Sequence, residues 1–265
     1  MACQKGYQVP AKLLQPMWLR SRESLTDNGL IYDPIATAAC QKCQLAPECL
    51  SDNIDQQQLL HATLTFECDE YVKSFLKKHV NGWIVNVGAG LDTRFYRLDN
   101  GRCHWLELDI NEHLLWRQRL FHANERYHMR CGSVTDTQWV KSIPIPDNVP
   151  ILIVCEQTLL ECSEQQVAHF IQMLGCHFNH AQACFVVAGD MCSTPLALKL
   201  GAGKYRHGIS NPAQKFIGWL PWSQSVSVSS PIDKECNRWN VWQRWLAKLP
   251  FLKNRLTPIF VHITW

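Results

Sequence analysis

Hydrophobic and polar positions along the chain alternate between a strand spacing and a helix spacing. Strands are predicted for five short apolar runs that are rich in β-favouring residues: 84–87, 104–109, 126–131, 151–154 and 183–190. Helical spacing follows in 111–124 and again in 163–174, where Ser163 and Gln166 have capping chemistry. This succession predicts a doubly wound α/β fold with a mostly parallel sheet and helices on both faces.

The two ends of the chain lack the strand–helix alternation of the middle part. The N-terminal region is predicted to be helical from 11 to 79, with breaks at Asp33-Pro34 and between 40 and 52. Near the C-terminus, 257–265 is predicted as a strand, and 225–230 is either a polar strand or a loop.

Three tryptophans, Trp239, Trp242 and Trp245, recur at helical spacing. Such a set packs a helix against a core more often than it stacks on a substrate, so core packing is expected. We interpret residues 1–265 as a single domain. It comprises a helical N-terminal region (1–80), a ligand-binding core (81–190) and a substrate-side cap with the final strands (191–265).

Composition narrows the class of protein. A net charge of +3 gives no broad electrostatic footprint for nucleic acid, and no apolar run has membrane-spanning length. We therefore expect neither nucleic acid nor membrane as a partner. The N-terminus lacks a signal-peptide core, and 13 scattered cysteines suit reduced thiols better than a disulfide framework. A cytoplasmic enzyme is expected.

The most informative segment is the apolar run at 84–87, which leads directly into Gly88-Ala89-Gly90. Glycines allow a sharp bend and a close approach of the backbone to a ligand. A dinucleotide fingerprint needs a third glycine where Thr93 stands, and Asp92 would repel a pyrophosphate. A nicotinamide-dependent oxidoreductase is therefore disfavoured.

S-adenosylmethionine fits this segment better, because it carries a sulfonium and an ammonium and no phosphate. Asp109 ends the next apolar run about 20 residues later, where an acceptor for a ribose diol belongs. The alternative is an ordinary glycine turn beside a solvated acid.

The sequence Val-Asn-Val-Gly-Ala-Gly-Leu-Asp-Thr-Arg-Phe-Tyr-Arg-Leu at 85–98 resembles the signature of the leucine carboxyl methyltransferase family. The similarity continues at 106–110, at 155–161 and in the N-terminal elements 20–23 and 32–34. The resemblance implies a class I methyltransferase (Rossmann-like) fold with a helical N-terminal extension, a C-terminal cap and an antiparallel last strand. It also implies an S-adenosylmethionine-dependent O-methyltransferase, akin to bacterial enzymes that act on polyketide-type small molecules.

The resemblance also assigns residues to the cofactor. Gly88 and Gly90 would line its methionine portion, Asp109 would bind the ribose, and Glu156 would face the ammonium. Arg20 or Arg22 matches a family residue that holds the carboxylate, and the sequence leaves open which one. Asp92 and Arg94 are expected to pair locally and organise the turn.

Two positions depart from the family pattern. An arginine usual in the family is missing near Leu64, so a carboxylate clamp is lost unless Arg20 or Arg22 replaces it. In the loop after the third strand, Ser133, followed by Val134, stands where the family has an acid that contacts adenine. These departures motivate a second hypothesis, a catalytically degenerate methyltransferase that acts as a binding or scaffold protein.

The acceptor decides whether a general base is needed. A carboxylate is already ionised at neutral pH, whereas a hydroxyl must lose its proton as the oxygen attacks. His177, His180 and His207 are the weak candidates for that base, and a structural or surface role is more common for such residues. By resemblance, 204–217 is expected to cover the substrate entrance. The substrate would be a small molecule with a carboxylate or hydroxyl.

Cys40, Cys43 and Cys49, with His61 beyond them, are compact enough to suggest a zinc or iron–sulfur site. A complete site needs four ligands, and the customary second Cys-x-x-Cys pair is absent. Helix-packed thiols without a metal are the favoured interpretation.

Overall fold

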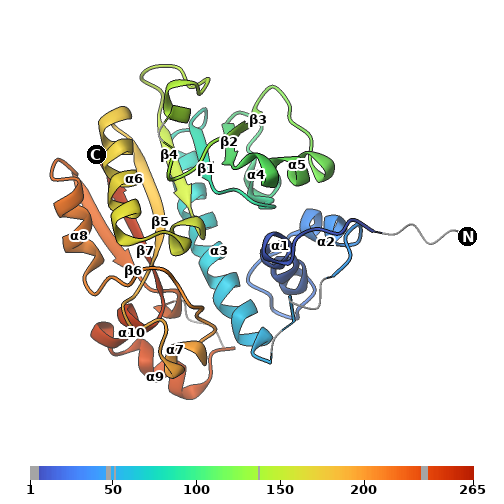
Figure 1. Ribbon diagram of the computed structural model, residues 1–265, viewed down its shortest axis with the longest axis vertical. Coiled ribbons are helices and arrows are strands. Elements are labelled where there is room, and N and C mark those ends of the chain that lie inside the picture. Colours follow the sequence, from blue (N-terminus) through green and yellow to red (C-terminus); the bar gives the residue numbers. More distant parts are fainter. Residues whose placement is uncertain (1–5, 46–48, 51, 137, 234–237) are drawn as a thin grey trace, which may run out of the picture.

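The computed structural model describes residues 6–45, 49–50, 52–136, 138–233 and 238–265. Within them, one sheet has the strand order β3-β2-β1-β4-β5-β7-β6 (Figure 1). Its strands are β1 (Trp83–Val87), β2 (His104–Asp109), β3 (Tyr127–Cys131), β4 (Ile151–Cys155), β5 (Gln182–Ala188), β6 (Ser225–Ser229) and β7 (Pro258–Thr264). Strands β1 to β5 are parallel, and β7 is antiparallel to both β5 and β6. The predicted doubly wound, mostly parallel α/β fold is confirmed.

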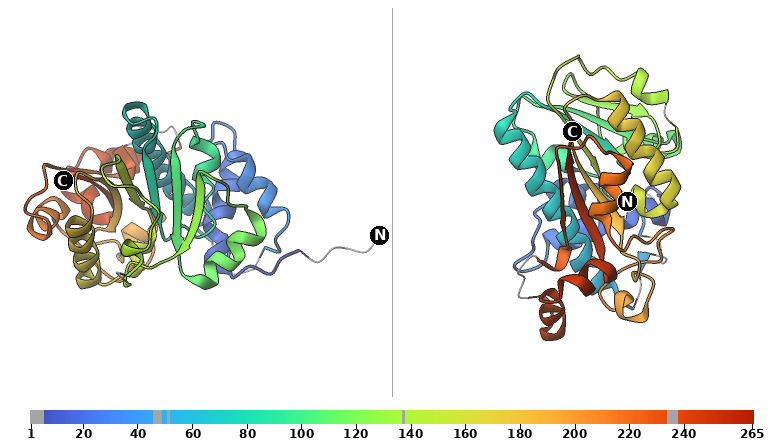
Figure 2. Two further views of the ribbon diagram at one scale, coloured as in Figure 1. Left: turned by 90° about the horizontal axis from the view of Figure 1, so that it is seen from above. Right: turned by 90° about the vertical axis from the view of Figure 1, so that its left-hand side faces the viewer.

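Helices cover both faces of this sheet (Figure 2). The α-helices are α1 (Ala11–Ser24), α2 (Pro34–Cys40), α3 (Ile54–Lys78), α4 (Arg94–Leu98), α5 (Asn111–Leu120), α6 (Glu164–His177), α7 (Pro195–Leu198), α8 (Pro212–Trp219), α9 (Val241–Ala247) and α10 (Pro250–Leu256). Short 3₁₀ helices are η2 (Gln138–Lys141), η3 (Thr158–Glu161) and η4 (Pro231–Asp233). Apolar residues of α3, α4 and α5 join one core, and those of α6 and α8 join the other.

The central strands β1 and β4 are mostly apolar because both of their faces are covered. Every residue of β1 and β4 is buried. Alternate side chains of β1 enter opposite cores: Ile84 lies in one, and Val85 and Val87 lie in the other. Strand β1 is therefore packed on both faces up to the point where it leads into the glycine turn.

The N-terminal helices break where the sequence predicts. Asp33 caps α2, because its Oδ1 accepts a hydrogen bond from the Ala36 amide at 2.9 Å, and Pro34 occupies the first turn. Ser163 and Gln166 form the expected capping box at the start of α6. Helix α5 ends at Leu120, four residues earlier than predicted, because the backbone becomes extended at Phe121.

In the C-terminal third, the structure decides whether 225–230 is a strand or a loop, and it corrects the prediction for the three tryptophans. Residues 225–229 form the edge strand β6, and the last strand is antiparallel, as expected. Trp239 is buried at 2% exposure, but Trp242 and Trp245 are 40% and 66% exposed. The prediction that all three pack a core is wrong for these two, because α9 turns Gln243 and Leu246 inward instead. Within the described residues, none of the helices has both the length and the apolar character needed to span a membrane.

Candidate active site

The glycine turn follows the carboxyl end of β1 and has a backbone that only glycine adopts easily. Gly88 and Gly90 have φ values of +70° and +49°, in the left-handed region. A Cβ atom on Gly88 would lie 1.6 Å from Oγ1 of Thr158, at the start of η3. The amides of Gly88 and Ala89 both donate to the carbonyl of Leu108, at 2.8 and 3.1 Å. The turn is therefore fixed against β2 on one side and η3 on the other.

Asp109, at the end of β2, lies directly against this turn. Its Oδ2 accepts a hydrogen bond from the Gly90 amide at 2.6 Å. Its Oδ1 accepts from the Ile110 amide at 2.7 Å and contacts Nδ1 of His113 at 2.9 Å. The hydrogen bond with Asp109 raises the pKa of His113. A carboxylate offers about four acceptor positions, so these three contacts leave one on Oδ2.

The structure distinguishes Arg20 from Arg22. Arg20 is buried, and its Nη2 donates to the carbonyl of Leu91 in the glycine turn at 2.8 Å. Its Nε donates to Asp33 at 3.3 Å. Arg22 instead points away from the turn, to Asp55 at 2.9 Å and over the ring of Trp18. Only Arg20 joins the candidate site.

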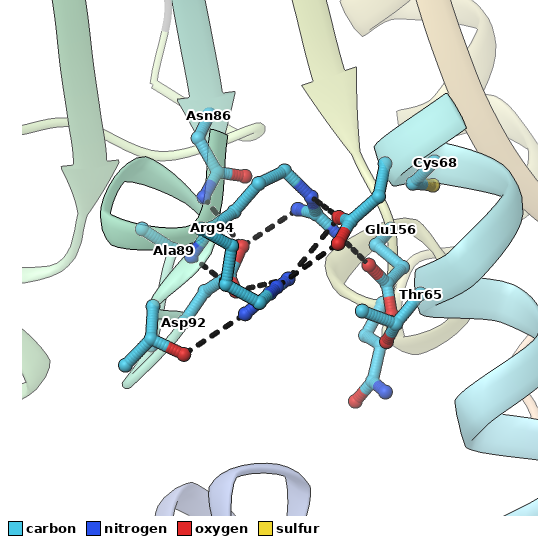
Figure 3. A network of polar contacts seen from close by, with 12 residues as sticks. Thr65, Cys68, Asn86, Ala89, Asp92, Arg94 and Glu156 are labelled. Atoms are coloured by element: carbon cyan, nitrogen blue, oxygen red, sulfur yellow. Dashed lines mark hydrogen bonds and ion pairs between the residues drawn. The ribbon is translucent and has the colours of Figure 1, made fainter. Parts of the chain in front are cut away.

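Arg94 connects the glycine turn to α3 and β4 (Figure 3). It is 1% exposed, and its guanidinium donates to Asp69 and Asp92, each at 2.6 Å, and to Oε2 of Glu156. Burial alone would lower the pKa of Arg94, but the three carboxylates outweigh burial and raise it. For Asp92, burial raises the pKa, and the surrounding arginines outweigh this effect and lower it. The predicted local pairing of Asp92 and Arg94 is confirmed, with a wider role for Arg94 than the sequence suggested.

A second arginine of the same segment, Arg97, extends the network to α2. It donates to Asp33 at 2.7 Å and to Asp69 at 2.9 Å, and Thr93 also donates to Asp33. The sequence interpretation missed Asp33 and Asp69 as partners. The Asp-Pro pair at 33–34 indicated a helix cap, but no local pattern in α3 marked Asp69.

Beneath the turn, Arg117 binds the backbone of the turn itself. Its guanidinium donates to the carbonyls of Gly90 at 2.9 Å and Asp92 at 2.7 Å, and to Glu107 at 2.6 Å. Glu107 also accepts from Asn86 at 2.8 Å. Burial raises the pKa of Glu107 to about 7, although Arg117 opposes the shift. This buried pair therefore holds the turn through its backbone carbonyls.

Negative charge exceeds positive charge around the turn. Among the described residues, six carboxyl groups and four guanidinium groups take part, and none of these side chains is more than 12% exposed. The carboxyl groups are Asp33, Asp69, Asp92, Glu107, Asp109 and Glu156, and the guanidinium groups are Arg20, Arg94, Arg97 and Arg117. Glu107, with its pKa of about 7, is only partly ionised at neutral pH, but the carboxylates still outnumber the guanidinium groups when it is counted as half a charge. In a poorly solvated region, such an excess favours a cationic ligand and disfavours a pyrophosphate.

Glu156 stands at the carboxyl end of β4, at the side of the site formed by α3. Its Oε1 accepts from Thr65 at 2.8 Å. Next to it, Gln157 contacts Nδ1 of His61 at 2.7 Å, and Nε2 of His61 lies 3.1 Å from the carbonyl of Pro16. Burial lowers the pKa of His61 to about 4. His61 is therefore a neutral ring at pH 7 that links α1, α3 and the end of β4.

The other predicted positions are spread along the same edge of the sheet and beyond it. Ser133 follows β3, where its Oγ lies 3.0 Å from Oγ1 of Thr135 and 3.2 Å from the Thr135 amide, and Val134 is buried. Along 204–217, the amide of Arg206 donates to Leu160 in η3, and that of Ile209 donates to Ala188 at the end of β5.

The three histidine candidates are not brought to the glycine turn. His177 and His180 are exposed and precede β5, at the opposite edge of the sheet from Gly88 and Gly90. The ring of His207 is occupied on both nitrogens, because Nε2 accepts from the Ala188 amide at 3.0 Å and Nδ1 lies 2.9 Å from the carbonyl of Cys162. Burial lowers the pKa of His207 as well. Its contacts are those of a structural residue.

The cysteine-rich segment shows thiols in ordinary packing contacts. Sγ of Cys43 donates to the carbonyl of Ala39, one turn earlier, and Cys49 is buried with its Sγ 3.6 Å from the carbonyl of Ala11. His61 directs its ring nitrogens to Pro16 and Gln157 instead. Across the described part of the chain, no group of three or more potential ligands is arranged to hold a metal ion.

Comparison with known sequences supports the family resemblance. Residues 14–133 match the sequence model of leucine carboxyl methyltransferase, so the resemblance to that family is confirmed. The tetracenomycin polyketide synthesis O-methyltransferase TcmP of Streptomyces glaucescens is 32% identical over 89 residues. That match spans 33% of this chain and 32% of the relative, so it covers about a third of the relative's length.

Solved structures show the same fold along almost the whole chain. A DUF574 family protein from Streptomyces avermitilis MA-4680 superposes with a TM-score of 0.60 at 8% identity, covering 98% of this chain and 97% of that one. A putative methyltransferase from Thermobifida fusca YX superposes with a TM-score of 0.56 at 14% identity, covering 99% and 96%. The predicted class I methyltransferase (Rossmann-like) fold is confirmed.

Proposed function

We propose that this chain is an S-adenosylmethionine-dependent O-methyltransferase of small molecules. Its residues 14–133 match the sequence model of leucine carboxyl methyltransferase. When bound, the cofactor supplies an electrophilic methyl group on a sulfonium. The protein has to bind it, exclude water and align an acceptor oxygen with the methyl group. We further propose that the reaction takes place in the cytoplasm, which buried thiols such as Cys68, Cys155 and Cys184 support, because thiols stay reduced there.

The observation that carries the proposal is the glycine turn held by Asp109 within a buried excess of carboxylates. Gly88 and Gly90 expose backbone that a ligand can approach closely. Even with Glu107 counted as half-ionised, the carboxylates outnumber the four guanidinium groups and favour a ligand of net positive charge, as S-adenosylmethionine is. A pyrophosphate-containing dinucleotide would meet repulsion at the same place.

The remaining hydrogen-bonding capacity of three side chains fits the polar groups of the cofactor. Asp109 retains an acceptor position for the ribose diol beside its bond to Gly90. Glu156 accepts from Thr65 and Arg94, and its other acceptor positions suit the ammonium. Arg20 uses two of its five N–H groups on Asp33 and Leu91, so donors remain for the carboxylate. In this way Arg20 would compensate for the arginine that is missing near Leu64.

We assign the adenine end of the cofactor to the loop after β3. Val134 is buried and offers an apolar contact, and Ser133 carries a hydroxyl that is shared with Thr135. A hydroxyl binds the adenine amine less strongly than a carboxylate does. We therefore expect this loop to contribute orientation more than affinity.

For the acceptor, we favour a carboxylate over a hydroxyl. A hydroxyl needs a base close to the methyl group. The histidine candidates for that base are His177 and His180, at the far edge of the sheet, and His207, which is bonded through both ring nitrogens. A carboxylate acceptor needs no proton removal, so the site requires only positioning.

Calorimetric titration with S-adenosylhomocysteine tests cofactor binding directly. We expect saturable binding, and Asp109→Asn should weaken it about 10- to 100-fold, because a charged acceptor of about 1.5–3 kcal/mol is lost. Asp55→Asn is the matched control, since Asp55 is exposed and pairs with Arg22, outside the site. Absence of binding by the unaltered chain would support the alternative, a degenerate scaffold protein, and would refute the proposal.

The pH dependence of methyl transfer distinguishes the two acceptor types. With a panel of small carboxylic acids and phenols, a carboxylate acceptor should give a rate that is nearly flat above about pH 6, because the acid is already ionised. A rate that rises about tenfold per pH unit through the neutral range would indicate a hydroxyl acceptor that must lose its proton. This result would reverse the preference for carboxylate while leaving the methyltransferase proposal intact.

A further inference from the structure

The C-terminal helices α9 and α10 carry large apolar side chains on their outer surface. Val241 and Phe251 are 74% and 76% exposed, and Trp242, Trp245 and Leu249 are also exposed. Helices α9 and α10 lie together at one end of the molecule, away from α1 and α2 (Figure 1). Contiguous exposed apolar groups of this kind mark interaction sites more often than isolated ones do.

This outward orientation is fixed by contacts on the inner side of α9. Gln243 is buried and donates to Oε1 of Gln56, at the start of α3, at 2.7 Å. Leu246 enters the core, and Asn240 and Gln243 form a capping box. The tryptophans therefore face solvent because the opposite face of the helix is anchored.

Positive charge accompanies the exposed aromatic rings. From Arg238 to Trp265 the sequence contains no Asp or Glu. Three basic residues of this segment, Arg238, Lys253 and Arg255, form ion pairs with acidic residues elsewhere. Arg244 and Lys248 are exposed on α9 and just after it, and neither forms an ion pair within the described residues.

We propose that this α9–α10 surface, formed by Val241, Trp242, Arg244, Trp245, Lys248, Leu249 and Phe251, docks onto a membrane surface that contains anionic lipids. Tryptophan suits the boundary between headgroups and acyl chains, because its ring is apolar and its N–H is polar. Basic side chains beside such rings are attracted by anionic headgroups. The expectation of no membrane partner rests on the absence of an apolar run long enough to span a membrane, which does not exclude docking of a surface patch.

Charge also argues against a second copy of the chain as the occupant. In a two-fold dimer the same surface faces itself, so two surfaces that both carry unpaired positive charge would be brought together. An anionic lipid surface gives these side chains complementary charge instead. This inference does not depend on the proposed methyltransferase activity.

Docking in this way would orient the candidate active site with respect to the membrane. The carbonyl of Arg255, at the end of α10, accepts from the amide of Met191, and that of Thr257 accepts from Gly189. Met191 and Gly189 follow the carboxyl end of β5, the same edge of the sheet that carries Asp109 and Glu156. The carboxyl edge of the sheet therefore lies next to the α9–α10 surface.

Co-sedimentation of the full chain with lipid vesicles tests the proposal. We expect binding to phosphatidylcholine vesicles that contain about one-third phosphatidylserine, and much weaker binding to phosphatidylcholine alone. Trp242→Ser with Trp245→Ser should weaken binding at least tenfold. Arg244→Gln with Lys248→Gln should weaken it about 10- to 30-fold, since each basic residue contributes about fivefold at an anionic surface. Higher salt should weaken the binding of the unaltered chain.

Matched controls come from exposed residues elsewhere. Trp222→Ser removes an exposed tryptophan after α8, and Lys77→Gln with Lys78→Gln removes two exposed charges at the end of α3. These variants should bind as the unaltered chain does. The substituted side chains are all exposed, so every variant should remain folded; thermal unfolding checks this and separates lost docking from lost folding.

Three results would overturn the proposal. The first is the absence of binding to vesicles with phosphatidylserine. The second is equal weakening by the control variants. The third is a concentration-dependent dimer in sedimentation velocity that is abolished by Trp242→Ser with Trp245→Ser, which would assign the surface to a second copy.

Discussion

Replacing Gly88 with alanine should damage both the stability of the fold and the binding of the cofactor. Two separate penalties apply at this position. The backbone has φ of +70°, and the new Cβ would lie 1.6 Å from Oγ1 and 2.5 Å from Cβ of Thr158. Because the second contact involves Cβ of Thr158, rotation of that side chain cannot relieve the overlap, and η3 or the turn has to move.

Each penalty can be assigned a rough size. A left-handed conformation costs a residue with a Cβ about 1–2 kcal/mol. Overpacking of a tight contact typically adds about 1–3 kcal/mol. Gly101→Ala isolates the first penalty, because Gly101 has φ of +77° and a Cβ atom added there would meet no heavy atom within 4 Å. The free energy of unfolding of Gly88→Ala should therefore fall below that of Gly101→Ala by about 1–3 kcal/mol.

Urea unfolding of the two variants measures this difference, and titration with S-adenosylhomocysteine measures its functional counterpart. Gly101→Ala lies in the turn before β2 and should bind the ligand normally, whereas Gly88→Ala should lose at least tenfold in affinity. Equal destabilisation of the two variants would refute the reasoning, because it would mean that the contact between Gly88 and Thr158 does not constrain the turn.

Two further predictions concern charged and titratable groups. Arg20→Gln should weaken binding of S-adenosylhomocysteine about 10-fold or more, while Arg22→Gln, whose side chain points to Asp55, should leave the affinity unchanged; equal affinities of the two variants in calorimetry would contradict the assignment of Arg20. The pKa of His61 is about 4 in the fold and 6.5 when unfolded, so the unfolded chain binds the proton more tightly and stability falls as pH decreases from 6.5 to 4. His61 should account for about 3 kcal/mol of that loss, and His61→Gln should flatten this part of the stability profile measured by urea unfolding; an unchanged slope would contradict it.

Local sequence signals predicted the strands and the glycine turn, because these features arise from interactions between residues that are close in the chain. The run at 84–87 is buried on both faces, and the left-handed φ values of Gly88 and Gly90 favour glycine at those positions. The capping box of Ser163 and Gln166 involves residues three apart in the chain. Such features need no information from distant segments.

Features that depend on the orientation of a helix or a side chain were harder to predict from the sequence. Trp239, Trp242 and Trp245 share a helical spacing, but spacing does not say which face of a helix is buried, and α9 turns two of these rings outward. Likewise, Arg20 and Arg22 are two positions apart on α1 and point in different directions, one to the turn and one to Asp55.

The sequence by itself determined the succession of strands and helices along the chain, the glycine turn and Asp109, the acid that follows it. The tertiary structure decided which charges meet: Asp33 caps α2, Asp69 lies on α3 and Glu156 follows β4. Arg94 and Arg97 join them in a buried network. It also separated His177 and His180 from the turn, at the other edge of the sheet. The physical reason is that periodicity and turn chemistry act between neighbours in the chain, whereas a charged cluster is formed by side chains that only the packing of distant helices on the sheet brings within a few ångströms.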